Sequence, residues 1–93
     1  MMKEAYDELL SVLAETTDLE KVRAFLDDIL TPKERSDLAM RWQLMVELHQ
    51  GQTQRSIAKR HNISLCKITR GSKILKTEDS FTANALKKRH PKE

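Results

Sequence analysis

The sequence predicts an all-α fold, and two observations lead to this prediction. Glycine occurs only at positions 51 and 71 and proline only at positions 32 and 91, so few residues interrupt helices over the 93-residue chain. Apolar residues recur at spacings of three and four, as on one face of a helix, and no segment shows the sustained alternation of a strand. Six helices account for this pattern.

The N-terminal part of the chain predicts two amphipathic helices. The first is expected at residues 3–14, and its apolar stripe consists of Tyr6, Leu9, Leu10 and Leu13. Residues 16–18 interrupt this stripe, and a second one follows between residues 19 and 29. Thr17 and Glu20 have the spacing of a capping box, so we expect Thr17 to cap the second helix.

The third helix has the clearest start signal in the sequence. Thr31 can cap it, Pro32 suits the first helical position, and Glu34 can reach back to the cap. The helix is expected to run to about Gln50, with Gly51 ending it in a left-handed conformation. Because its apolar residues lie on more than one face, this helix is predicted to be central in the core.

Three shorter helices are expected in the C-terminal part. Thr53 can cap a helix at residues 54–61, and Asn62 tolerates a left-handed turn. Ser64 can cap a fifth helix at residues 65–75. A sixth, shorter helix is expected at about residues 78–88, before a basic tail.

The fourth and fifth predicted helices fit the pattern of a helix-turn-helix. A small residue, Ala58, stands where two helices must approach closely, and isoleucines occupy the three apolar positions of the motif: Ile57, Ile63 and Ile68. His61 is polar and off this pattern. An ordinary antiparallel helix pair in a small bundle would match several of the same positions.

Charge is strongly polarised along the chain and supports the helix-turn-helix interpretation. Residues 1–51 hold eleven acidic and six basic side chains, whereas residues 52–93 hold eleven basic and three acidic ones. Between residues 52 and 76 there are seven basic side chains and no acidic one. A solvated basic face is the simpler alternative, but charge and motif coincide, which predicts a surface that binds double-stranded DNA.

The predicted contacts with DNA follow from this motif. The second helix of such a motif enters the major groove, and the remaining basic residues mostly contact phosphates. The residues expected to bind DNA are Gln54, Arg55, Lys59, Ser64, Leu65, Cys66, Lys67, Thr69, Ser72, Lys73 and Lys76.

Composition and motif content exclude several other classes of protein. A chain of this length is one domain at most, and with four aromatic residues its core is small, so a partner subunit is expected. The single Cys66 cannot form an internal disulfide, and no apolar run is long enough for a membrane span. The histidines lack metal-ligand spacing, and no catalytic constellation or phosphate-binding loop is present. We expect a cytoplasmic protein that is not an enzyme.

Several motifs together resemble the tryptophan repressor family. Residues 68–72, Ile-Thr-Arg-Gly-Ser, are followed by Leu75 and Lys76, while Leu30-Thr31-Pro32 precedes Glu34, Arg35 and Arg41 at fixed distances. Gln54 and Arg55 open the fourth helix in the same way. The resemblance covers about residues 29–76, and the first 28 residues match in helix pattern only.

The resemblance implies a fold and a ligand. Tryptophan repressors are intertwined all-helical homodimers and are well-known examples of helix-turn-helix proteins that bind palindromic operators. They use L-tryptophan as corepressor and need no other cofactor. The corresponding ligand-binding residues are Arg41, Arg70, Gly71, Thr31, Leu30 and Asp28. The two arginines would enclose the indole ring, Thr31 would reach the ligand from the other subunit, and Leu30 and Asp28 would offer backbone carbonyls.

Three departures from the family pattern leave alternatives open. Lys67 and Ile74 replace a threonine and a serine beside the ligand, and the loop between Gly51 and Gln54 is one residue shorter than in the enterobacterial form. The primary expectation is a repressor of genes for tryptophan biosynthesis or transport, with a dimerisation core at residues 1–51, a helix-turn-helix at 52–76 and a C-terminal helix and tail at 77–93. The alternatives are a ligand-independent DNA-binding regulator of the same family and a helical protein-interaction adaptor.

Overall fold

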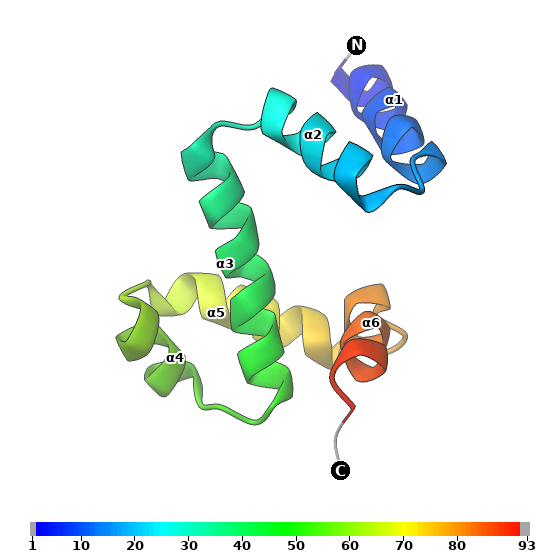
Figure 1. Cartoon of the computed structure of the whole chain (residues 1–93). Helices are drawn as coiled ribbons and strands as arrows, with labels where there is room; N and C mark the ends of the chain where they lie inside the picture. The colour runs from blue at the N-terminus through cyan, green and yellow to red at the C-terminus, as the bar shows by residue number, and fades with distance from the viewer. Residues whose placement is uncertain (1, 92–93) are drawn as a thin grey trace. The chain divides into compact units, whose positions relative to one another are not determined.

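The protein is all-helical over residues 2–91, the part of the chain that the computed structural model describes. The helices are α1 (Met2–Glu15), α2 (Leu19–Ile29), α3 (Pro32–His49), α4 (Gln54–His61), α5 (Leu65–Lys76) and α6 (Phe81–Arg89), and the described residues form no strand (Figure 1). These helices confirm the predicted fold class and number of elements. The chain divides into two compact units, residues 1–36 and 37–93, with the boundary inside α3.

In the first unit, side chains fix the starts of α2 and α3. Asp18, rather than Thr17, caps α2, because its carboxylate accepts a hydrogen bond from the backbone N–H of Glu20. The prediction of Thr17 as the cap is therefore wrong by one residue. The capping box at α3 is confirmed: the Thr31 hydroxyl accepts from the Glu34 N–H at 3.1 Å, and the Glu34 carboxylate accepts from the Thr31 N–H at 2.8 Å.

The apolar stripes of α1 and α2 remain accessible in the single chain. None of the described residues of either helix is buried, and Tyr6 and Leu19 are both well exposed. A helix stripe of this kind usually covers a core, since burial of apolar surface is the main source of helix stability in proteins.

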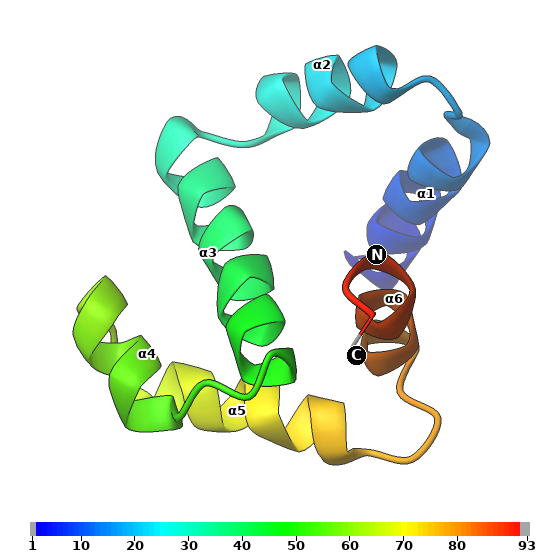
Figure 2. The same ribbon diagram turned by 60° about the horizontal axis from the view of Figure 1, so that its bottom comes forward.

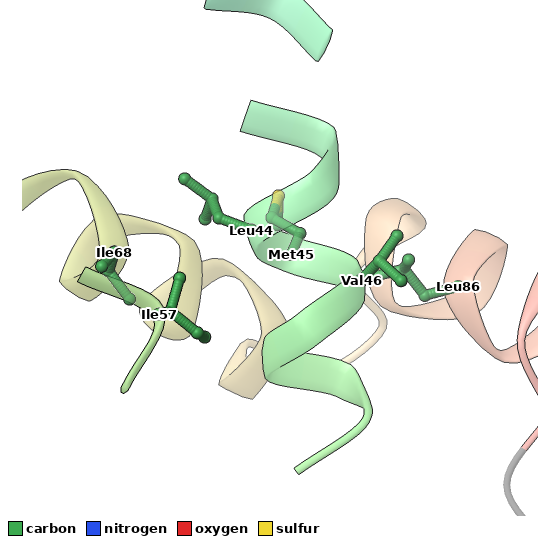
Figure 3. Packing of buried hydrophobic residues seen from close by; sticks show 6 residues of the cluster. All are labelled: Leu44, Met45, Val46, Ile57, Ile68 and Leu86. Carbon is green, nitrogen blue, oxygen red and sulfur yellow. The ribbon is translucent and has the colours of Figure 1, made fainter. Parts of the chain in front are cut away.

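The second unit has its core where the C-terminal half of α3 meets α4, α5 and α6. The buried apolar residues are Leu44, Met45, Val46, Ile57, Ile68 and Leu86. Figure 3 shows Val46 of α3 and Leu86 of α6 turned toward each other, while Ile57 and Ile68 pack between α4 and α5. Ile57 and Ile68 are completely inaccessible to solvent, which confirms their predicted place in the pair of helices.

The connection between α4 and α5 has the local geometry expected from the sequence. The Thr53 hydroxyl caps α4 by accepting from the Ser56 N–H, and Asn62 adopts the left-handed conformation with φ 53°. Ser64 occupies the cap position of α5 without a side-chain hydrogen bond. In Figure 2, α5 crosses below the end of α3, and α4 lies next to α5 at the side of α3.

The last helix begins later than predicted. Ser80 caps α6 by accepting from the Ala83 N–H at 3.2 Å, so the helix starts at Phe81 and not near Glu78. The preceding residue, Asp79, has a positive φ of 58°, which no residue inside a helix adopts.

Among the described residues, no helix is sufficiently long and apolar to span a bilayer.

Candidate ligand cavity and nucleic-acid interface

A cavity of about 200 Å³ lies between α3 and α5 in the second unit, and three of the predicted ligand residues line it. Arg41 comes from α3, and Arg70 and Gly71 come from α5. These residues are about thirty positions apart in the sequence, and the packing of the two helices brings them together. The rest of the lining consists of Leu44, Met45, Lys67 and Ile74.

The lining combines apolar side chains with three cations and contains no acidic group. Leu44 and Met45 offer an apolar surface, and a guanidinium can stack on an aromatic face or pair with a carboxylate through two hydrogen bonds. Such a lining suits a small, flat, apolar ligand that carries a negative charge. Lys67 adds a third cation to the cavity. The replacement of the expected threonine by Lys67 therefore changes the lining of the cavity itself.

Gly71 permits the close approach of α5 to α3. A Cβ atom at this position would lie 2.9 Å from Cδ1 of Leu44 and 3.5 Å from Cγ of Met45. Any larger residue would therefore displace side chains that form the core and the cavity wall. The absence of a side chain at Gly71 serves helix packing as well as space in the cavity.

The other predicted ligand residues, Asp28, Leu30 and Thr31, belong to the first unit. Asp28 lies in the last turn of α2, where helix carbonyls lack partners within the helix. The Leu30 carbonyl accepts a hydrogen bond from Nη1 of Arg35 at 2.7 Å, and the exposed Thr31 hydroxyl participates in the capping box of α3. Arg35 thus helps to fix the local geometry of this connection.

The helices α4 and α5 carry the predicted cationic surface. The exposed basic residues of this surface are Arg55, Lys59, Arg60, Lys67, Arg70, Lys73 and Lys76. Over residues 52–76, all of which the structure describes, no acidic side chain offsets them. The surface can therefore attract a polyanion such as the phosphate backbone of a nucleic acid.

The remaining predicted DNA-binding residues differ in accessibility. Ser64, Leu65, Cys66 and Thr69 are exposed, and Gln54 is half-buried. The Thr69 hydroxyl lies 3.0 Å from Oε1 of Gln54, and this hydrogen bond connects the two helices on their outer side. Ser72 is buried and lines a groove with Leu48 and Leu75.

An ionic cluster around a buried carboxylate connects α3 to α4, and its Arg60 side chain is 47% exposed. We did not expect this cluster from the sequence. Glu47 of α3 is only 4% exposed, and its carboxylate contacts Arg60 and His61 at the end of α4. Two features of the sequence could have indicated this cluster. They are the acidic Glu47 within the apolar segment 44–48 and the polar His61, which does not fit the helix-turn-helix pattern. Each is unremarkable alone, and only the tertiary structure shows that they are partners.

These features define a class of protein: a small helical protein with a cationic helix pair beside a cavity that suits a charged aromatic ligand. The family model described as "Trp repressor protein" matches residues 4–90, which is nearly the whole chain. The chain belongs to this family, whose members are regulatory DNA-binding proteins and not enzymes.

Curated relatives agree with the family match. A "Trp operon repressor homolog" of Xylella fastidiosa is 31% identical over 88 residues, covering 94% of both chains. A protein of the same name from Chlamydia trachomatis serovar L2 is 39% identical over 69 residues, covering 69% of this chain and 73% of the relative. A third, from Vibrio parahaemolyticus, is 28% identical over 83 residues, covering 88% and 81%. No solved structure gave a significant match.

Proposed function

We propose that the protein is a homodimeric helix-turn-helix repressor that binds a palindromic operator when L-tryptophan occupies the cavity between α3 and α5. The observation that carries this proposal is the convergence of Arg41, Arg70 and Gly71 on one cavity, of which the cationic helix α5 forms a wall. Because α5 forms both a wall of the cavity and the recognition helix, a ligand there can alter how α5 is presented to DNA. The genes controlled would be those of tryptophan biosynthesis or transport.

The electrostatic part of this proposal has a direct test. Affinity for a labelled DNA duplex, followed by fluorescence anisotropy, should fall steeply with salt, because cationic side chains release counterions from the phosphates. A salt-insensitive affinity would argue for the protein-interaction adaptor instead. Selection of duplexes from a random pool, with and without L-tryptophan, would then define the operator and its dependence on the ligand.

The corepressor part of the proposal is tested by calorimetry. We expect L-tryptophan to bind the purified protein, and operator DNA must tighten ligand binding by the same factor by which the ligand tightens DNA binding. Equal ligand affinities with and without operator DNA would remove the corepressor role. Heat is the better observable, because Trp42 contributes its own fluorescence.

A ligand-independent regulator is the second candidate, and two residues of the cavity lining favour it. Lys67 introduces a cation and Ile74 an apolar side chain beside the ligand position, and neither can accept a hydrogen bond from an amino group. We expect the double variant K67T/I74S to bind L-tryptophan more tightly than the wild type. An unchanged affinity would show that the two side chains do not determine ligand binding.

A further inference from the structure

The carboxylate of Glu47 is the centre of the ionic cluster that connects α3 to α4. Nε2 of His61 lies 2.6 Å from Oε2 of Glu47, and the amide of Gln43 donates to the same oxygen at 2.9 Å. The guanidinium of Arg60 donates to Oε1. A buried charge is costly without partners, and here both oxygens are hydrogen-bonded.

The environment keeps this carboxylate charged. Burial by itself raises the pKa of Glu47, but the hydrogen bonds from Gln43 and His61 and the electrostatic interactions with His61 and Arg60 outweigh it, so the pKa lies below its usual value. Gln43 belongs to α3, whereas Arg60 and His61 belong to α4. The cluster is therefore an electrostatic connection between the two helices.

Arg60 differs from its neighbours in the cationic segment. Besides Glu47, its guanidinium contacts Oε1 of Gln52 at 2.9 Å and the Ser56 hydroxyl at 3.3 Å. Of the seven basic residues between positions 52 and 76, all described by the structure, Arg60 alone forms an ion pair. The adjacent Lys59 is exposed and is free of such contacts within the described residues.

We propose that Glu47 and Arg60 are positioning residues for DNA binding, which hold α4 on α3 and thereby orient α5, and that Arg60 is not a phosphate contact. This inference rests on the proposed DNA-binding function. It assigns Arg60, one of the seven basic residues between positions 52 and 76, to the contact between the core helix α3 and the pair α4 and α5. Its geometric basis is that α5 contacts α4 and also packs on α3 at Gly71, so a shift of α4 changes the presentation of the recognition surface.

The salt dependence of DNA binding distinguishes a positioning cation from a phosphate-binding one. Each lost phosphate contact lowers the slope of log affinity against log salt by about 0.9. We expect R60Q to weaken DNA binding by about tenfold, a size typical of coupling between sites, with the wild-type salt slope. The matched control K59Q should lower affinity together with the slope. A slope for R60Q that falls as in K59Q would overturn the proposal.

A double-mutant cycle tests the partnership. E47Q should weaken DNA binding as R60Q does, and E47Q/R60Q should be no weaker than either single variant, because residues of one network are not additive. All measurements are made well below the melting temperature, with helicity verified by circular dichroism. Loss of stability without loss of affinity in the folded variants would show a merely structural role and overturn the proposal.

If R60Q does not fold, the conservative variant R60K tests whether Arg60 positions α4 or contacts a phosphate. Lysine keeps the charge but cannot make the forked contacts to Glu47, Gln52 and Ser56. We expect R60K to bind DNA more weakly than the wild type with an unchanged salt slope, whereas full affinity would identify Arg60 as a phosphate contact. If the wild type shows no salt-dependent DNA binding, the proposed function itself fails, and this inference fails with it.

Discussion

Arg70 combines two proposed roles at the scale of a single residue, because it lines the cavity and is exposed beside the cationic surface. We expect Arg70→Ala to abolish L-tryptophan binding in calorimetry and to leave the dimer intact in sedimentation. Lys73→Ala, on the same helix but outside the cavity lining, is the control and should retain ligand binding. Undiminished ligand affinity in Arg70→Ala would place the ligand elsewhere.

Arg41 allows the stacking contribution to be measured separately. Arg41→Ala should weaken ligand binding by about 0.5–2 kcal/mol, the size of one cation–π contact. The same calorimetric titration gives this value. A complete loss of binding would instead assign Arg41 a role in holding the ligand carboxylate.

Glu47 should make stability depend on pH. Its folded-state pKa is lowered from the usual 4.5, so its contribution to the free energy of unfolding is fully present above about pH 4.5 and is lost as the pH falls through the folded-state value. We expect the melting temperature of the wild type to fall more steeply on acidification below this pH than that of Glu47→Gln. Parallel curves for the two proteins would contradict this prediction.

At the scale of the element, the pair α4 and α5 depends on two isoleucines that are inaccessible to solvent. Ile57→Ala removes three carbons from the centre of the pair and should lower the free energy of unfolding by about 2–5 kcal/mol. Leu65→Ala, at an exposed position of α5, is the control and should change stability much less. Urea denaturation followed by circular dichroism measures both.

Local signals predicted most element boundaries, and the exceptions have physical causes. The capping box at Thr31 and Glu34 and the left-handed Asn62 follow from neighbouring residues alone, and both are confirmed. The cap of α2 is wrong by one residue because threonine and aspartate are both good caps, and sequence spacing did not decide between them. The start of α6 was placed too early because a turn with Asp79 at positive φ precedes Ser80.

At the scale of the whole molecule, the distribution of apolar surface predicts self-association. None of the described residues of α1 and α2 is buried within the chain, although both helices carry apolar stripes. We expect a homodimer at micromolar concentration, because a partner subunit would cover this surface. Sedimentation equilibrium should return twice the chain mass of 10.8 kDa, and a monomer with native helicity would contradict the prediction.

The sequence by itself determined the helical fold, the polarised charge and the residues that carry the family resemblance, because these depend on local periodicity, composition and short motifs. Tertiary structure alone decided which residues meet across the chain. It brought Arg41 to the same cavity as Arg70, buried Ser72 of α5 and paired Glu47 with Arg60 and His61. A pattern along one helix shows which face is polar, but the partner of a buried charge is set by the packing of a second helix against it.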